Sequence, residues 1–265
     1  CRWGRVPHIQ ADVQKSGRDT IYNRGMNMKK IIKTAIVAAS LFTIGATESG
    51  PAMDPENPTC PLVPNWSANS TMELTPKMIN GTKILFAEGA VDEGLPDRLR
   101  KMLADNPDIS EIWLRSPVGV ARAGNEAGRV IREADALIIT RIPQGWTCFS
   151  ACNFVFMGGR ARIVEPGAHF MVHMFTMTND RNAINYSIEM GTDSTVGLIG
   201  EVEQQSALLA TEDNDFLIRM GVSRKLLSEV MYRTNAVKTE DGDKSTRRCL
   251  TNEEALRYNV ANVDG

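Results

Sequence analysis

Short apolar runs alternate with amphipathic stretches between residues 84 and 173. The apolar runs predict five strands: Ile84–Ala87, Ile112–Leu114, Leu137–Thr140, Ala161–Val164 and His169–His173. The amphipathic stretches predict helices over Asp92–Asn106 and Ala121–Ala134, and a third helix is expected just after Ser150. Alternation of this kind is typical of βαβ units, so we predict an α/β fold of repeated βαβ units with a mainly parallel sheet.

The same pattern predicts which side chains are buried. The expected apolar helix faces comprise Leu95, Leu99, Met102 and Leu103 in the first helix and Ala127, Val130 and Ile131 in the second. The strand Leu137–Thr140 is apolar enough to be buried on both faces. Active sites of such sheets form beyond the carboxyl ends of the strands, which directs attention to the loops Ser116–Gly119 and Gly145–Ser150.

Further helices are predicted after residue 190. Thr192–Met220 has the character of one long helix or two, and Ser223–Tyr232 that of another, with Ser223 as its cap. A loop rich in Gly, Asp and Lys follows, over Asn235–Ser245. Thr251 and Glu254 have capping-box spacing and predict a last short helix.

The region before residue 81 divides into three expected parts. Residues 1–27 are interpreted as an upstream extension without a fold, and residues 28–46 as a secretory signal with two lysines before a short apolar stretch. The stretch is shorter than the about 20 residues of a membrane helix, and cleavage is expected after Ala46 or Ala52; left uncleaved, it would act as a membrane anchor. Residues 47–80, rich in Pro, Asn, Ser and Thr, are expected to be a loosely ordered leader, and residues 81–265 the α/β domain. The predicted location is periplasmic or secreted.

Composition adds little beyond excluding one partner. Apolar residues make up 42% and charged residues 23% of the chain, as in ordinary globular proteins. The formal net charge is −2 and no face rich in Lys and Arg is visible, which argues against a nucleic-acid partner.

Four cysteines follow the signal: Cys60, Cys148, Cys152 and Cys249. An even number favours disulfides in an exported protein, and four cysteines allow three pairings. If the chain is helical between Cys148 and Cys152, their Cα atoms lie about 6 Å apart, within bridging reach. That bridge would leave Cys60 to pair with Cys249. The alternative is that Cys148 and Cys152 are packed, reduced thiols.

Ser150 lies between two of these cysteines, where a loop gives way to an apolar helix. Free N–H groups at a helix start suit a capping serine, and they equally suit a nucleophile whose oxyanion needs donors. A nucleophile needs a base, and the only histidines after the signal are His169 and His173. No lysine lies between Lys101 and Lys225, so histidine is the available base. Two histidines do not complete a zinc site, and no metal or cofactor is expected.

Three motifs carry a resemblance to a known family. Leu114-Arg115-Ser116-Pro117-Val118-Gly119 resembles the Ser-Pro-Gly-Gly turn of the crotonase-like clan, in particular the Clp protease proteolytic subunit. Cys148-Phe149-Ser150-Ala151-Cys152 resembles a segment of exported bacterial relatives of that subunit, and Met157-Gly158-Gly159, Val164-Glu165-Pro166-Gly167-Ala168 and Val172-His173-Met174 fit the same pattern. The likeness covers about residues 84–175, with a weaker tail at residues 250–260.

The resemblance implies roles for single residues. Ser150 matches the nucleophile, His173 the general base, and the N–H groups of Gly119 and Ala151 the oxyanion donors; His169 is taken as structural. The family's acid falls on Arg247, which leaves Asp241 and Asp243 as tentative third residues. Val118 replaces the first glycine of the turn, an unfavourable exchange if that position needs a positive φ.

The expected function is an exported serine hydrolase, a peptidase that works through an acyl-enzyme on a peptide or ester substrate and without ATP. The alternative is a non-catalytic relative that serves binding or assembly, because fold does not imply function. Thioester chemistry of the crotonase kind is a lesser alternative, since an exported protein has little access to CoA. The resemblance also implies a homo-oligomer, and the apolar segment Phe170–Met177 is assigned either to a subunit contact or to the core.

Overall fold

The described part of the chain belongs to one compact unit, Glu48–Gly265. The structure is a computed structural model and describes residues 52–55, 57–178, 180–235 and 246–265. The predicted upstream extension and signal segment, and the tentative acids Asp241 and Asp243, lie outside the described residues and stay predictions. Within the described ranges, no helix has both the length and the apolar character that crossing a membrane requires.

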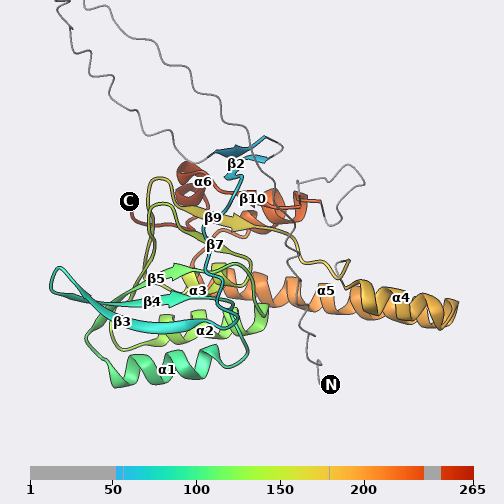
Figure 1. Cartoon of the computed structure of the whole chain (residues 1–265), viewed down its shortest axis with the longest axis horizontal. Helices are drawn as coiled ribbons and strands as arrows, with labels where there is room; N and C mark the ends of the chain where they lie inside the picture. Colours follow the sequence, from blue (N-terminus) through green and yellow to red (C-terminus); the bar gives the residue numbers. More distant parts are fainter. Residues whose placement is uncertain (1–51, 56, 179, 236–245) are drawn as a thin grey trace, which may run out of the picture. The chain divides into compact units, whose positions relative to one another are not determined.

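The larger of the sheets has five strands in the order β3-β4-β5-β6-β8. Figure 1 labels three of them, β3, β4 and β5. The sheet's strands are β3 (Glu73–Ile79), β4 (Thr82–Glu88), β5 (Ile109–Arg115), β6 (Ile139–Ile142) and β8 (Ala161–Val164). The last four pair in parallel, and β3 pairs antiparallel with β4. The predicted α/β class with parallel strands is therefore confirmed, whereas the specific crotonase-like arrangement stays a prediction.

Helices α1 (Leu95–Asp105) and α2 (Ala121–Glu133) connect successive parallel strands of this sheet and contact one another. Their buried side chains include most of those predicted from the periodicity: Leu95, Leu99, Ala127, Val130 and Ile131. The third strand differs from the prediction. It begins at Ile139, and Leu137 is 70% exposed, because the chain is still in the connection from α2 at that point.

A second sheet carries the segments around Ser150. It has the order β10-β9-β7 and consists of β7 (Thr147–Phe149), β9 (His169–Val172) and β10 (Arg248–Cys249). Strand β7 is parallel to β9, and β10 is antiparallel to β9. Every residue of β9 is buried, and Phe170, Met171 and Val172 are fully so. This part of the segment Phe170–Met177 is therefore core, not a contact between subunits.

The leader is more ordered than its composition predicts. Strand β3 forms one edge of the larger sheet, and β1 (Met53–Asp54) pairs with β2 (Asn57–Pro61). The Asn65 carbonyl accepts a hydrogen bond from the N–H of Thr147, and Trp66 stacks on Phe149 at 6.0 Å between ring centroids. The prediction of a loosely ordered segment is wrong for these residues, because backbone pairing and aromatic packing supply the order that apolar periodicity does not reveal.

The C-terminal helices complete the unit. Thr192–Met220 is one helix, α5, which follows the shorter α4 (Arg181–Glu189). The predicted helix Ser223–Tyr232 is instead a π-helical turn, η1 (Leu226–Val230), followed by a 3-10 turn, η2 (Met231–Arg233). The last helix, α6 (Asn252–Arg257), begins with the predicted capping box between Thr251 and Glu254.

Candidate active site

Ser150 occupies a strained turn between a strand and a helix. Strand β7 ends at Phe149, and helix α3 (Cys152–Met157) begins two residues after Ser150. The φ angle of Ser150 is +60°, a left-handed conformation that few residues other than glycine adopt. Such strain persists where the surrounding structure imposes it, and it concentrates at functional sites.

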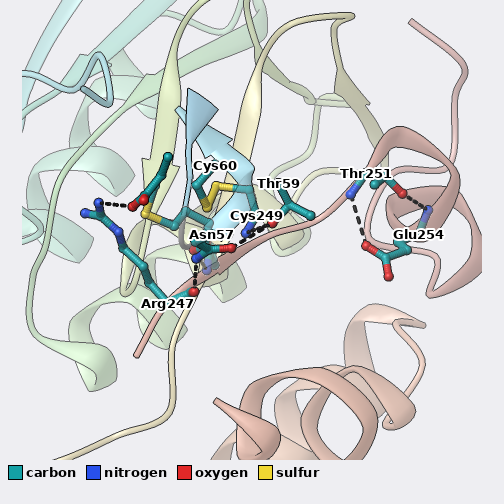
Figure 2. The surroundings of a disulfide bond; sticks show 10 residues. Asn57, Thr59, Cys60, Arg247, Cys249, Thr251 and Glu254 are labelled. Carbon is teal, nitrogen blue, oxygen red and sulfur yellow. Dashed lines mark hydrogen bonds and ion pairs between the residues drawn. A yellow bond between two sulfur atoms is a disulfide. The ribbon is translucent and has the colours of Figure 1, made fainter. Parts of the chain in front are cut away.

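Two disulfides hold the segments of the site. Cys148 and Cys152 are joined across Ser150, with Cα atoms 5.4 Å apart, and Cys60 is joined to Cys249, with Cα atoms 5.1 Å apart. Figure 2 shows the second bridge, where the hydroxyl of Thr59 also accepts a hydrogen bond from the Cys249 N–H. All four cysteines are fully buried. Both pairings follow the expectation of a local bridge and a long-range one.

His173 lies within hydrogen-bond distance of Ser150. Its Nε2 atom is 2.8 Å from Ser150 Oγ. His173 directly follows β9, and β9 lies beside β7, so the parallel pairing of the two strands brings the ends that carry Ser150 and His173 to the same edge. The ring of Phe149 contacts the imidazole at 4.8 Å between centroids and limits its orientation.

Burial lowers the pKa of both histidines below the usual value. For His173 the main cause is loss of hydration of the charged form, which a backbone contact with Met174 partly opposes. The imidazole is therefore held neutral, the form that a general base requires. The pKa of His169 is lowered by burial alone, and its Nε2 is buried without a hydrogen-bond partner. Among the described residues, His173 and not His169 is the histidine hydrogen-bonded to Ser150.

In the described ranges, His173 has no carboxylate partner: its one side-chain hydrogen bond is to Ser150, and no Asp or Glu forms an ion pair with it. Arg247, at the position that the resemblance assigns to the acid, forms an ion pair at 3.5 Å with the buried Asp54. Asn57 also donates a hydrogen bond to the carbonyl of Arg247. Arg247 is thus held against β1 and β2, and the disulfide between Cys60 and Cys249 joins β2 to β10.

The loop after β5 lies beside the Ser150 turn. A bridge pairs Ser116 with Cys148, and the N–H of Phe149 donates to the Ser116 carbonyl at 3.0 Å. Gly119 is required on steric grounds, because a Cβ there would lie 2.4 Å from both the Cβ and the carbonyl oxygen of Val91. In the described ranges, no hydrogen bond uses the N–H of Gly119 or that of Ala151.

Val118 does not disturb this loop. Its φ is not positive, its side chain is 51% exposed, and its carbonyl accepts a hydrogen bond from the N–H of Val91 at 3.0 Å. The concern that a β-branched residue replaces a glycine with positive φ therefore does not apply at this position.

Ser150 and His173 line a pocket of about 990 Å³. Gly119 and Ala151 line it as well, and most of its other lining side chains are apolar. Three buried polar residues also line it: Asp54 of β1, Asn153 of α3 and Asp213 of α5. None of them was predicted from the sequence as a site residue. Asp213 precedes Phe216 and Leu217 by three and four residues, so its place on the buried face of α5 was the available signal.

Within the described residues, no cluster of three or more side chains of the kinds that bind metals is present. The chemistry that the arrangement offers is that of a serine nucleophile beside a neutral histidine, with unused N–H groups at the edge of the same pocket.

Comparisons with known proteins add a structural likeness. No protein-family model matches the chain, and no curated protein matches it. Among solved structures, the chain is similar to a ClpP1 mutant from Listeria monocytogenes, with 17% sequence identity and a TM-score of 0.47, over 69% of this chain and 90% of that one. These values are too low to establish a family or an activity.

Proposed function

We propose that this protein is an exported serine hydrolase, a peptidase in which Ser150 is the nucleophile and His173 the general base. The observation that carries the proposal is the distance of 2.8 Å between Ser150 Oγ and His173 Nε2 at the edge of a large pocket. The positive φ of Ser150 and the disulfide that spans it support a turn built to present this hydroxyl.

The reaction proceeds through an acyl-enzyme. His173 Nε2 accepts the proton of Ser150 Oγ as the oxygen attacks the substrate carbonyl, and the N–H groups of Gly119 and Ala151 donate to the resulting oxyanion. The protonated His173 then gives its proton to the leaving amine. Water attacks the acyl-enzyme by the same route, which restores both side chains. A carboxylate at Asp243 or Asp241 would orient the imidazole through its second nitrogen.

We place the mature protein in the periplasm or outside the cell. Two buried disulfides support an oxidising compartment. The apolar stretch in residues 28–46, which lies outside the described part of the chain, supplies the export signal. N-terminal sequencing of the protein recovered from a periplasmic extract tests this, with cleavage after Ala46 or Ala52 as the expected result.

A peptidase assay with matched variants tests the activity. Ser150→Ala and His173→Ala are each expected to abolish hydrolysis of fluorogenic peptides, whereas Ser228→Ala, at an exposed serine on η1, retains it. Equal hydrolysis by wild type and Ser150→Ala would contradict the proposal.

The second candidate function is binding or assembly without catalysis. The observation that favours it is the lack, in the described ranges, of a carboxylate on His173. A protein of this kind would cleave no peptide or ester, and it would tolerate Ser150→Ala without change in any of its interactions. Hydrolysis that depends on both Ser150 and His173 excludes this candidate.

We also propose that the protein assembles as a homo-oligomer. Exposed apolar side chains on α4 and the first half of α5 support it: Tyr186, Ile188, Val196 and Ile199. Light scattering of the purified protein tests the proposal, and a monomer at micromolar concentration would contradict it.

A further inference from the structure

Asp213 is a buried carboxylate without a basic partner. It lies on α5, is 7% exposed, and accepts a hydrogen bond from Asn125 Nδ2 at 3.1 Å. No lysine, arginine or histidine of the described residues forms an ion pair with it. The pocket that contains Ser150 and His173 is the pocket that Asp213 lines. Burying an unpaired charge costs free energy of folding, so the position of this carboxylate requires an explanation.

Helix packing places Asp213 toward the end of α2 that contacts Ala151. Gly124, next to Asn125 on α2, packs so closely that a Cβ would lie 2.4 Å from the carbonyl oxygen of Ala151. One turn farther along both helices, the ring of Phe216 packs against Gly128. The pair of Asn125 and Asp213 therefore lies one helical turn closer to Ala151, and hence to Ser150, than this second contact.

A second acceptor in the same pocket is unused. Asn153 is 3% exposed; its Nδ2 donates to the carbonyl of Met171 at 2.7 Å, whereas its Oδ1 is buried with no hydrogen-bond partner. Asn153 and Asp213 both line the pocket, whose other lining side chains are mostly apolar. The one cation among the residues that line the pocket, Arg247, has its own partner in Asp54.

The groups that shift the pKa of Asp213 include no positive charge. Burial raises the pKa of its carboxyl to about 6, the hydrogen bond from Asn125 lowers it, and the nearby Glu212 raises it again. Burial, and after it the charge of Asp213, raise the pKa of Tyr232. None of these neighbours offers a positive charge, so a cationic group from outside the chain would gain a charge-assisted hydrogen bond.

We propose that Asp213, with Asn153 Oδ1, binds the lysine or arginine side chain of a substrate residue next to the bond that Ser150 attacks. This rests on the proposed function, which supplies the substrate backbone and the attacked carbonyl. The long apolar stem of either side chain suits the apolar walls of the pocket, and its cationic end meets the two acceptors. The protein is therefore a peptidase specific for basic residues at the position before the cleaved bond.

Binding to a chemically inert variant tests the proposal independently of catalysis. Calorimetry with Ser150→Ala compares acetyl-Leu-Leu-Arg-amide with acetyl-Leu-Leu-Leu-amide. We expect the arginine peptide to bind at least tenfold more tightly, since a hydrogen bond to a charged group is worth roughly 10- to 100-fold in affinity. Equal affinity for the two peptides, or tighter binding of the leucine peptide, would overturn the proposal. This comparison requires no substitution at Asp213.

Two further variants test whether Asp213 causes the preference for the arginine peptide. In the Ser150→Ala background, Asp213→Asn is expected to remove the preference for arginine and leave the affinity for the leucine peptide within about threefold. Asp215→Asn, at an exposed carboxylate two residues along α5, is expected to retain the preference. A preference that survives Asp213→Asn assigns the binding elsewhere. A preference for arginine with no hydrolysis by the wild type would instead remove the proposed function and leave the cation site.

Discussion

Gly124 of α2 lies directly against the carbonyl oxygen of Ala151, so that a Cβ on Gly124 would be 2.4 Å from that oxygen. Helix α2 therefore packs directly against the turn that carries Ser150. In the proposed mechanism the N–H of Ala151 donates to the oxyanion, so the position of α2 would affect the geometry of that step.

Substitution at Gly124 is expected to displace the turn. Gly124→Ala forces α2 and α3 apart, because backbone at 2.4 Å cannot yield as a flexible side chain does. We expect a loss of about 1–3 kcal/mol in the free energy of unfolding and a fall of tenfold or more in kcat/KM. The control is Gly200→Ala on α5, where nothing lies within 4 Å of the added Cβ; it should stabilise the protein by up to about 1 kcal/mol. Full activity of Gly124→Ala would contradict the role of this contact.

The two disulfides are expected to affect different properties. Cys60 and Cys249 are 189 residues apart and Cys148 and Cys152 only 4. In the loop-entropy model the first bridge contributes about 5 kcal/mol and the second about 2 kcal/mol. Alanine at both Cys60 and Cys249 should therefore lower Tm more, whereas alanine at both Cys148 and Cys152 should reduce kcat more, since it frees the Ser150 turn. Thermal melts and peptide hydrolysis of the two double variants measure both, and the reverse ranking would contradict the assignment.

The pH dependence of activity reports the state of His173. Burial lowers the pKa of its imidazole, so the neutral base persists to lower pH than for an exposed histidine. The acid limb of kcat/KM should fall below pH 6.5, the usual histidine value. A limb above that value would instead indicate a carboxylate that stabilises the imidazolium, with Asp243 and Asp241 as the residues to substitute next.

Stability should depend on pH through Asp213. Its pKa is raised to about 6 in the folded protein from 3.8, so the folded state favours the protonated form. The penalty of the buried charge is absent below about pH 4, grows through about pH 6 and is complete above it, where it amounts to roughly 3 kcal/mol. Asp213→Asn, which keeps an acceptor for Asn125 Nδ2, should be more stable than wild type at pH 8 and equal to it at pH 4. Denaturant unfolding at both values tests this, and a difference independent of pH would contradict it.

Local patterns predict much of the fold. The spacing of Leu95 and Leu99, and of Ala127 and Ile131, identifies α1 and α2, because a helix that packs on a sheet needs one apolar face. Strand β3 escapes this reasoning. It is an edge strand that contains Pro76 and exposes Met78, and its order comes from pairing with β4, which no local pattern encodes.

The candidate site is predicted only in part for a similar reason. Ser150 and His173 stand out because they are reactive residue types in short motifs, and strand pairing then brings them together. Asp213 is one acidic residue among several in a long helix. Its spacing to Phe216 and Leu217 places it on the apolar face, but its hydrogen bond to Asn125 depends on the packing of α5 against α2. Arg247 cannot be the catalytic acid because it is an arginine, which the sequence shows directly. Its ion pair with Asp54 cannot be predicted from local sequence, because the two residues lie far apart in the chain.

Covalent labelling of Ser150 tests the central claim most directly. Intact-mass spectrometry after treatment with a fluorophosphonate, followed by peptide mapping, should find one adduct per chain, located on Ser150. The rate of labelling should fall by a factor of about 10² or more in His173→Ala, because the hydroxyl then lacks its base. Labelling that is absent in the wild type, or that proceeds at the same rate in Ser150→Ala, would contradict the claim that this serine is an activated nucleophile.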